Sequence, residues 1–373
     1  MKIVYLTRND GTDNRGVKMC NSLVRLGHKV INVGWDRTPD KSKDLQFLKE
    51  VKLRLLLRAG VIGENSLQGW GEYCGHVLRC LYEEKPDAVQ AVDEEKAVLV
   101  LPFKRILYRR LVVDVYDSVI ANRYRSRWLD FVARICRRLA NSGADCIIET
   151  APELQAMLGR FARKSVIIEN APYDPGPELA AAVPVSGPIR LGLGGGLTRR
   201  RMGLETLLAA LDLMPPGSVI VEASGWLGDE YAKNVFVRHP AVKYRWLSKA
   251  TDFLSLAAGC DALLYLRSDA DESLYAASVR PNRIFDALAV GRPIILNPQL
   301  TIARWVEQDN LGIVLPRFDA PSLASAIGSL KGRRAALPQQ AAQMRRVFLD
   351  GHIWPVMEQR LGELYKRYET RPG

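Results

Sequence analysis

Short apolar runs alternate with amphipathic stretches along the first half of the chain. The apolar runs predict buried strands over residues 2–7, 30–34, 87–92, 111–115, 144–149 and 165–169. Between them, apolar positions recur at helical spacing over residues 15–26, 71–84, 123–141 and 152–161. The basic stretch 41–60 is less regular. Strands that alternate with helices predict a parallel sheet covered on both faces.

A stretch rich in proline and alanine, residues 172–188, breaks this periodicity and predicts a linker. The alternation then starts again, with strands expected over 189–193, 218–222, 242–245, 262–266, 293–296 and 312–315. Helices are expected over 203–213, 251–258, 281–289, 302–308, 320–330 and 352–368. We therefore expect an α/β protein with two Rossmann-like, doubly wound parallel-sheet domains facing a cleft, where ligands bind at strand carboxyl ends.

The composition supports this picture and narrows the class of protein. The 373 residues suit two domains, and the 47% hydrophobic and 25% charged residues are typical of a soluble globular protein. No run approaches ~18 uninterrupted apolar residues, and Met1 leads into a strand pattern rather than a signal peptide. The six cysteines form no Cys-x-x-Cys pair and the four histidines lack metal-ligand spacing. These features favour a reducing cytoplasm, with neither a metal site nor a cofactor.

Much of the net charge of +12 concentrates between residues 102 and 141. Within this region, residues 123–139 interleave arginines with Trp128, Phe131 and other apolar residues. A basic helix of this kind is typical of a protein that lies on the anionic inner face of the cytoplasmic membrane. The alternative is a helix whose apolar residues face the core and whose arginines face water. No nucleic-acid-binding motif accompanies the charge, so no nucleic-acid partner is expected.

The most informative segment of the chain is residues 278–296. It predicts a loop, a helix opened by Pro281, a turn at Gly291 that ends the helix, and a buried strand. Asp286 lies one turn into this helix. The segment closely resembles the donor-binding segment of nucleotide-sugar glycosyltransferases of the GT-B architecture, in which a Pro-Asn-Lys…Glu…Ala-x-Gly-x-Pro-Val helix holds the nucleotide ribose.

A second match lies at residues 192–196, a glycine run that precedes Arg199, Arg200 and Arg201. Glycines let a backbone approach a diphosphate, and arginines at a helix N-terminus are unfavourable unless an anion is present. The segment is similar to the phosphate loop of the same family, in which an arginine and a lysine neutralise the leaving diphosphate. Met202 occupies the position of that lysine, so the charge is assigned to Arg199 or Arg201. A solvated arginine cluster is the alternative.

The first domain carries further matches. Residues 8–16 are similar to the glycine loop that faces donor phosphates and acceptor in this family, although a polar loop capped by Asp13 or Asn14 is the alternative. Residues 113–118 resemble Asp-x-His-Asp, with Tyr116 in place of the histidine. There Asp117 would align the acceptor hydroxyl, remove its proton or cap a helix. Residues 144–153 and 166–171 extend the resemblance over nearly the whole chain.

The resemblance implies a domain plan and a set of site residues. It places an acceptor-side domain at 1–173, a linker at 174–188, a nucleotide-sugar-binding domain at 189–350, and a helix at 351–373 that crosses back onto the first domain. Catalytic roles are expected for Asp117, Arg199 and Arg201, and acceptor contacts for Asp13, Asn14 and Tyr116. Donor contacts are expected for Gly11, Gly195, Gly196, Arg200, Glu272, Ser278, Arg280, Asn282, Arg283 and Asp286.

Several of these donor contacts have a structural alternative. Asp286 would accept both ribose hydroxyls or form an i,i+3 ion pair with Arg283, which occupies the usual lysine position near the phosphates. Ser278 occupies a position where family members often carry a glutamate. The acidic residues Asp269, Asp271 and Glu272 would contact the donor sugar or form a solvated turn.

The expected function is that of a family-4-like (group 1) hexosyltransferase. It would move a sugar from a nucleoside diphosphate sugar to a sugar hydroxyl on a lipid-linked or polysaccharide precursor, without a metal and with retention favoured over inversion. The expected partners are this donor, a glycan or lipid-linked sugar acceptor, and the anionic membrane. A nucleotide-sugar epimerase and a non-catalytic basic scaffold, binding membrane or nucleic acid, are the alternatives.

Overall fold

The computed structural model describes residues 1–39, 43, 45–59, 67–116, 118, 127–181, 186–247 and 250–370. The chain divides into two compact units. The first contains residues 1–169 together with the residues from 357 onward, and the second contains residues 170–356.

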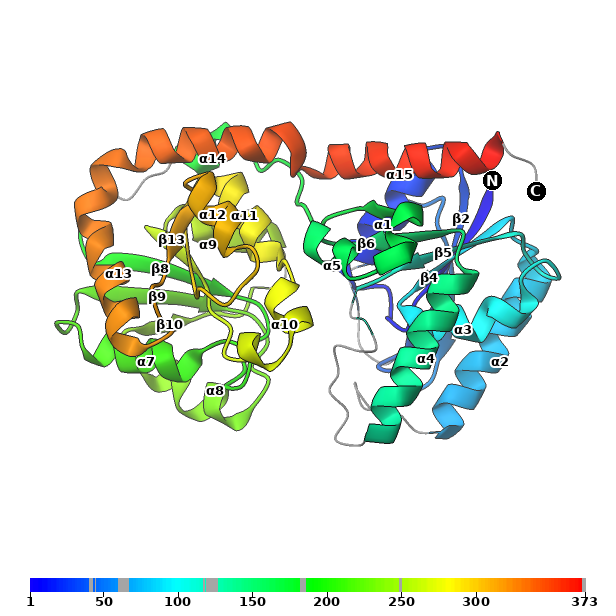
Figure 1. The fold of residues 1–373 in the computed structure, drawn as a ribbon, viewed down its shortest axis with the longest axis horizontal. Coiled ribbons are helices and arrows are strands. Elements are labelled where there is room, and N and C mark those ends of the chain that lie inside the picture. Colours follow the sequence, from blue (N-terminus) through cyan, green and yellow to red (C-terminus); the bar gives the residue numbers. More distant parts are fainter. Residues whose placement is uncertain are drawn as a thin grey trace. The chain divides into compact units, whose positions relative to one another are not determined.

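A parallel sheet forms the centre of the first unit (Figure 1). Its described strands lie in the order β3-β2-β1-β4-β5-β6-β7 and pair in parallel throughout. The chain winds outward from β1 to β3 and then from β4 to β7, so the sheet is doubly wound as predicted. The strands are β1 (Lys2–Leu6), β2 (Lys29–Asp36), β3 (Lys52–Leu57), β4 (Ala88–Val92), β5 (Arg110–Asp114), β6 (Cys146–Glu149) and β7 (Ser165–Ile167).

Helices cover both faces of this sheet. On one face lie α1 (Asn14–Arg25) and α15 (Trp354–Glu369), and on the other α2 (Leu67–Glu84), α3 (Glu94–Val100) and α4 (Arg127–Gly143) (Figure 1). Alternate residues of β1 explain why both faces need cover, because Ile3 and Tyr5 are as fully buried as Val4 and Leu6. Shorter helical segments are η1 (Leu101–Phe103), α5 (Pro152–Ala156) and η2 (Gly159–Lys164).

A second parallel sheet forms the centre of the other unit, with its described strands in the order β10-β9-β8-β11-β12-β13. This sheet also winds in both directions, from β8 to β10 and from β11 to β13. The strands are β8 (Ile189–Gly194), β9 (Val219–Ser224), β10 (Val242–Tyr244), β11 (Ala262–Tyr265), β12 (Ile294–Leu296) and β13 (Gly312–Val314). The predicted pair of doubly wound sheets is therefore confirmed.

Two apolar clusters hold helices onto the two faces of this second sheet. One cluster contains α7 (Leu204–Asp212), α8 (Glu230–Asn234) and α13 (Ala320–Arg333). The other contains α9 (Ala250–Ala258), α11 (Asn282–Val290), α12 (Ala303–Gln308) and α14 (Leu337–Gly351). The remaining short segments are α6 (Pro177–Ala181), η3 (Phe236–Arg238), η4 (Ala270–Glu272), α10 (Leu274–Ser278) and η5 (Arg334–Ala336).

Several elements were not expected from the sequence, including one strand, two longer helices and the short helices α6, α8 and α10. Strand β3 lies in the basic stretch where no regularity was seen, and it is an edge strand whose side chains are mostly half-buried. Helices α3 and α14 were also missed. The proline-rich segment expected as a linker contains one short helix, α6, which packs on α14 and α9.

The signals that bound α11 act as predicted. Pro281 is its N-cap, in extended conformation, and Gly291 ends the helix with a φ of 65°. In this left-handed conformation the N–H groups of the turn reach back to the last carbonyls of the helix, which glycine permits at little cost. Pro281 thus fixes the start of α11, where the predicted donor-binding residues lie, and Gly291 fixes its end.

Helix α15 is tied into the first unit by polar as well as apolar contacts. Its Glu358 pairs with Arg25 and accepts a hydrogen bond of 2.5 Å from Ser22, both on α1. The buried hydroxyl of Tyr365 donates to Oε1 of Gln90 on β4 at 2.9 Å. The side-chain amide of Gln90 in turn donates to Asp114 on β5 at 2.8 Å. These bonds join the end of the chain to the centre of the sheet.

Two expectations from the composition can be compared with this structure. All six cysteines are free, and burial raises the pKa of the buried thiols of Cys20, Cys146 and Cys260. None of the described helices is long and apolar enough to cross a membrane.

We predict that Tyr365→Phe lowers the thermal unfolding temperature by roughly 2–6 °C. The substitution leaves the buried Oε1 of Gln90 without its donor, which costs about 1–2 kcal/mol, and the phenyl ring keeps the packing. The control is Tyr82→Phe, at a position that is 68% exposed. Equal melting temperatures for the two variants in calorimetry would contradict this role.

Candidate functional site

The carboxyl edge of the second sheet brings a glycine loop and an arginine together. Gly195 follows β8 with a φ of 100°, a conformation that favours glycine. A Cβ atom at this position would lie 1.8 Å from Nη2 of Arg283, the second residue of α11. The guanidinium therefore lies against the backbone of the loop, in space that any other residue at position 195 would fill.

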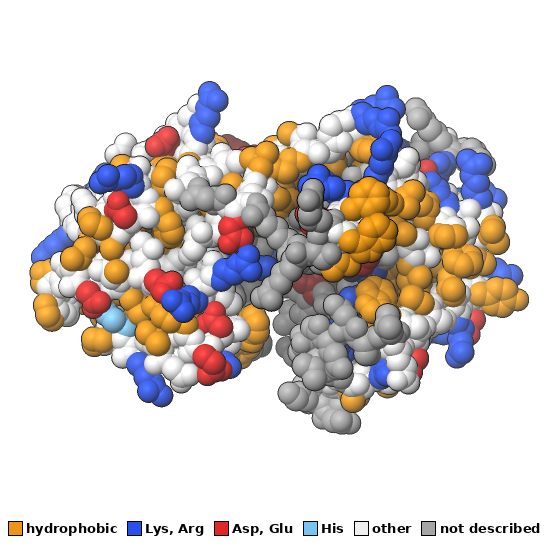
Figure 2. All heavy atoms as spheres, turned by 60° about the horizontal axis from the view of Figure 1, so that its bottom comes forward, with side chains coloured by type: hydrophobic (Ala, Val, Ile, Leu, Met, Phe, Trp, Pro, Cys, Tyr) orange, Lys and Arg blue, Asp and Glu red, His pale blue; other side chains and the backbone are white. Residues whose placement is uncertain are grey.

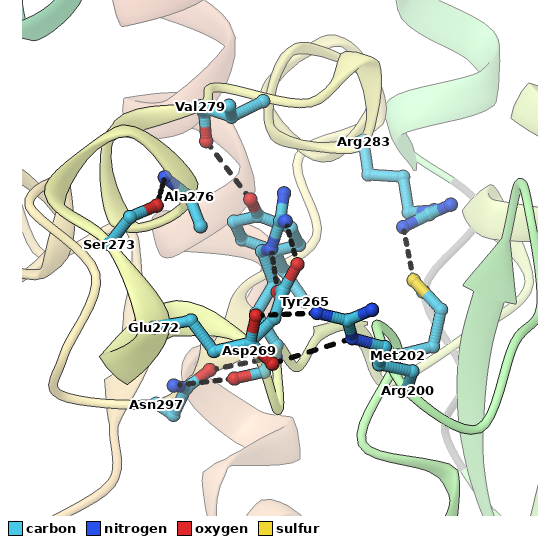
Figure 3. A network of polar contacts seen from close by, with 11 residues as sticks. Arg200, Met202, Tyr265, Asp269, Glu272, Ser273, Ala276, Val279, Arg283 and Asn297 are labelled. Carbon is cyan, nitrogen blue, oxygen red and sulfur yellow. Dashed lines mark hydrogen bonds and ion pairs between the residues drawn. The ribbon is translucent and has the colours of Figure 1, made fainter. Parts of the chain in front are cut away.

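Arg283 is a cation whose guanidinium meets a neutral sulfur rather than a carboxylate. Its Nη1 lies 3.8 Å from Sδ of Met202, and Figure 3 shows these two side chains facing each other. Within the described residues, Arg283 forms no salt bridge and its buried Nε has no hydrogen-bond partner. Burial and repulsion from Arg267 lower the pKa of Arg283 to about 10, so the group is still charged at pH 7. A cation in this situation suits an anionic ligand such as a phosphate.

Two helix N-termini lie at the same edge. Pro281, the N-cap of α11, and Gly203, the N-cap of α7, provide no side-chain hydrogen bond to the first turn of their helices. The unsatisfied N–H groups of such turns attract anions. Gly196, between β8 and α7, is exposed.

The three arginines that follow the glycine loop have different environments. Arg199 pairs at 2.7 Å with Glu205 in the first turn of α7, and Arg200 pairs at 2.8 Å with Glu272. Both are well exposed, at 59% and 73% of the side chain. Arg201 is exposed as well. The structure thus joins Arg200 and Glu272, two predicted donor residues, whereas Arg199 is engaged by a carboxylate that was not predicted.

A buried polar framework supports the loop that follows β11. The guanidinium of Arg267 donates two hydrogen bonds to Asp269, of 2.7 and 2.6 Å. The hydroxyl of Tyr265 donates to the carbonyl of Val279 at 2.9 Å (Figure 3). Asn297, just after β12, accepts from the N–H of Arg267 at 3.0 Å. Asp269 therefore has a structural role in this loop, and the side chain of Asp271 lies outside the described residues.

The other predicted donor residues lie around the start of α11. Asn282 is exposed at its first position, and Asp286 is half-buried one turn further on. Arg280 lies with its guanidinium 4.6 Å from the ring centre of Trp305. Ser278 is fully buried, and its hydroxyl has no hydrogen-bond partner within the described residues. Ser278 thus lies beneath this surface, and Asn282 is the residue most open to a ligand.

The carboxyl edge of the first sheet carries a separate polar cluster. Arg15 of α1 donates to Asp114 at 2.9 Å, and both side chains are buried. The hydroxyls of Tyr5 and Tyr116 form a hydrogen bond, and burial raises the pKa of both phenols. The guanidinium of Arg15 also lies 5.0 Å from the ring of Tyr116. Tyr116, a predicted acceptor residue, is therefore held at the edge by its neighbours.

Two buried glutamates lie at the ends of β4 and β6. Glu94 accepts a hydrogen bond of 2.5 Å from Ser118 and lies 3.8 Å from Nε of Arg137. Oε2 of Glu149 has no hydrogen-bond partner among the described residues. Burial, and then repulsion from Glu94, raise the pKa of Glu149 to about 8. A carboxyl group that titrates near neutral pH can act as a proton donor or acceptor.

The sequence had assigned no role to Glu94, Glu149, Arg15 or Asp114. For Asp114 and Glu149, the signal that could have found them is a charged residue at the end of an otherwise apolar strand, as in residues 146–149. In a parallel sheet such positions converge at one edge. Their charge alone does not reveal which of them is neutral or paired, because that depends on burial.

The remaining predictions for the first unit concern the loop before α1. Asp13 caps this helix by accepting from the N–H of Gly16 at 2.8 Å, so its expected structural role is confirmed. Asn14 is exposed at the first position of α1, and Gly11 adopts a φ of 93°. Acceptor and donor roles for these residues stay predictions. Asp117 lies outside the described residues. No cluster of His, Cys, Asp and Glu that could hold a metal occurs in the part of the chain described.

Comparison with solved structures identifies the architecture. The chain is similar to a sucrose-phosphate synthase (tll1590) from Thermosynechococcus elongatus, with a TM-score of 0.77 at 15% identity over 99% of each chain. It is similar to Anabaena Alr3699/HepE in complex with UDP and glucose, with a TM-score of 0.73 at 16% identity over 98% of this chain and 99% of that one. A third similar structure is WaaG, a glycosyltransferase involved in lipopolysaccharide biosynthesis, with a TM-score of 0.65 at 14% identity over 97% and 99%.

These similarities establish the fold and confirm the predicted GT-B architecture of two Rossmann-like parts. No protein-family model matches the sequence, and a search of curated proteins finds no match.

We predict that Glu149→Gln stabilises the protein increasingly as pH rises. The carboxyl group has an ordinary pKa of 4.5 and a folded pKa of about 8. The unfolded state therefore loses the proton first, and the wild-type protein loses stability as pH rises from about 4.5 through about 8. The uncharged variant avoids this loss, by roughly 2–4 kcal/mol above pH 8.

The measurement is the difference in thermal unfolding temperature between variant and wild type at pH 5, 7 and 9. Glu50→Gln, at an exposed position, is the control and is expected to show a constant difference. A constant difference for Glu149→Gln would refute a neutral carboxyl group at this edge.

Proposed function

We propose that this protein is a glycosyltransferase that moves a sugar from a nucleoside diphosphate donor to a hydroxyl of a second sugar. The observation that carries the proposal is the unpaired guanidinium of Arg283, which lies against the Gly195 backbone beside the uncapped start of α11. A diphosphate is the ligand that matches this combination of a fixed cation, N–H groups and an open backbone.

In this proposal the second unit holds the donor. Arg283 and the first turn of α11 bind the diphosphate, and Asp286, one turn into the same helix, accepts the ribose hydroxyls. Arg199 or Arg201 neutralises the diphosphate as it leaves, and Arg200 with Glu272 borders the sugar. Fixed positive charge of this kind stabilises a leaving diphosphate in the role that a metal ion fills elsewhere, so we propose transfer without a metal.

The first unit receives the acceptor. Tyr116, Asp13 and Asn14 would contact the acceptor sugar, and Asp117 would align its hydroxyl. We favour retention of the anomeric configuration, and inversion with Asp117 as base is the alternative.

Two of the structural neighbours support the choice of substrates. HepE is described in complex with UDP and glucose, and WaaG is described as a transferase of lipopolysaccharide biosynthesis. We therefore propose a UDP-sugar as donor and a lipid-linked or polysaccharide precursor as acceptor.

We predict that Arg283→Ala raises the dissociation constant of UDP by about 10- to 100-fold. A lost charge-assisted contact to a phosphate costs about 1.5–3 kcal/mol. Isothermal titration calorimetry with UDP, GDP and TDP measures the effect and identifies the base. Arg333→Ala, at an exposed position in the last turn of α13, is the control and should bind as the wild type does.

A further variant and an analysis of products distinguish glycosyl transfer from the two alternatives, epimerisation and a non-catalytic scaffold. Asp286→Ala should weaken UDP but not inorganic pyrophosphate, because only UDP carries ribose hydroxyls. Mass analysis of products then distinguishes transfer, which needs an acceptor, from epimerisation, which converts the donor alone. Unchanged UDP affinity in Arg283→Ala would refute the donor site, and absence of any nucleotide binding would favour the scaffold.

We further propose that α4 lies on an anionic membrane surface. The alternative, in which its apolar residues face the core, does not describe this helix, because small residues such as Ala133 and Ala140 form its buried side. The large apolar residues are 41–67% exposed, and Figure 2 shows hydrophobic side chains gathered on this unit over α4. These exposed residues are Trp128, Leu129, Phe131, Val132, Ile135 and Leu139.

The charges of α4 favour an anionic membrane as the surface that this helix contacts. Arg134 and Arg138 are exposed between the apolar side chains, so that one side of the helix offers both hydrophobic and cationic groups. Such a helix binds at the boundary between headgroups and acyl chains of anionic lipid.

We predict that Trp128→Glu combined with Phe131→Glu reduces binding to phosphatidylglycerol vesicles by at least about tenfold, since two buried aromatic contacts and two unit charges change. Co-sedimentation measures the bound fraction, and phosphatidylcholine vesicles give the background. Trp246→Glu, at a position 63% exposed in the other unit, is the control. Equal binding by all three proteins would exclude α4 as the membrane surface.

A further inference from the structure

A cavity of about 380 Å³ lies at the amino edge of the first sheet, where β5, β6 and β7 begin. The last turns of α15 form its other wall. Asp114 and Glu149 lie at the carboxyl ends of β5 and β6, and Glu94 follows the carboxyl end of β4. In a parallel sheet the two edges are opposite, so this cavity is separate from the predicted acceptor site. Its volume is that of a small-molecule site.

Five cationic side chains line this cavity, against two carboxylates. The cations come from the start of β5, from η2 and from α15, so that they surround the space rather than share one helix. They are Arg110, Arg163, Lys164, Arg360 and Arg367.

Four of these cations form no salt bridge with a described residue. Within the described residues, the salt bridges of the protein include none made by Arg163, Lys164, Arg360 or Arg367. Lys164 donates to the carbonyls of Ser142 and Ala144, at 3.1 and 2.5 Å, and Arg360 donates to the carbonyl of Ile167 at 3.2 Å. Neutral carbonyls satisfy their N–H groups without cancelling the charge.

The two carboxylates of the cavity are already engaged. Asp145 lies 2.8 Å from Nζ of Lys104, accepts from the N–H of Leu111 at 2.8 Å, and lies 3.7 Å from Arg110. Glu363 accepts from the side-chain amide of Gln359 at 3.0 Å. Burial, with repulsion from Lys104 and Arg163, lowers the pKa of Lys164, as expected in a site of net positive potential.

The remaining residues of the lining indicate which chemical groups the ligand carries. Tyr368 presents a ring on which Arg110 already stacks at 5.2 Å, and Val166 and Leu364 provide apolar surface. Guanidinium groups match the oxygens of a phosphate in pairs, and an aromatic or apolar wall packs against a carbon skeleton.

We propose that this cavity binds a phosphate-bearing ligand of about the size of a sugar phosphate, at a site distinct from the donor and acceptor sites. The phosphate group is held between Arg163 and Arg367, the two exposed cations on opposite walls, and Lys164 lies behind it. The proposal is independent of the proposed transfer reaction. The phosphate belongs either to a soluble metabolite or to a lipid headgroup.

Calorimetric titration with inorganic pyrophosphate tests the site. The full chain carrying Arg283→Ala is the starting protein, because that substitution weakens phosphate binding in the second unit. We expect residual pyrophosphate binding that Arg163→Ala combined with Arg367→Ala weakens by at least about tenfold at constant salt. Both positions are exposed, so the folded structure is expected to persist, and circular dichroism checks it. The matched control is Lys366→Ala, next to Arg367 on α15 but outside the lining, and it should bind within twofold of the starting protein.

A second arm separates the two sources of phosphate. Binding to phosphatidylglycerol vesicles is measured with the same variants. A loss confined to vesicles identifies a lipid headgroup, and a loss confined to pyrophosphate identifies a soluble ligand. The site is refuted if the double substitution changes neither pyrophosphate binding nor vesicle binding, or if it changes each of them no more than Lys366→Ala does.

Discussion

The buried carboxylate of Asp114 is the interaction on which the first unit depends. It is fully buried and accepts hydrogen bonds from Arg15 on α1 and Gln90 on β4, and Gln90 in turn is bound by Tyr365 on α15. Loss of one partner of a buried ion pair costs about 3–5 kcal/mol, because the other charge stays in a medium that solvates it poorly. These bonds fix α1, α15, β4 and β5 relative to one another at the carboxyl end of β5. The neighbouring Glu94 and Glu149 therefore lie in rigid surroundings.

The two sheets use burial in opposite ways at their carboxyl edges. In the second unit a cation, Arg283, is held charged without a salt bridge to a described residue, which prepares the edge for an anion. In the first unit a carboxyl group, Glu149, is shifted toward its neutral form, which prepares the edge for proton exchange. Both arrangements are unfavourable in the free protein and are stabilised by the surrounding structure, as is common where a ligand or a reaction supplies the missing interaction.

Much of this fold could be predicted from the alternation of apolar and polar positions, and the Pro281 and Gly291 signals placed α11 within one residue of its observed bounds. Strand β3 was missed because an edge strand is only half-buried and carries Lys52 and Arg54 among its apolar residues. Periodicity could not tell which side of α4 is buried, since its core side is made of small residues. The contact between Arg283 and Gly195 joins positions 88 residues apart along the chain (283 − 195), and only the folded sheet brings them together.

The bond between Gln90 and Tyr365 spans 275 positions, so the first unit cannot be completed until residue 365 has left the ribosome. The second unit, by contrast, is continuous in sequence and can fold as soon as it emerges. During synthesis the part of the first sheet that α15 covers, beside α1 (Figure 1), therefore stays exposed while the second unit folds.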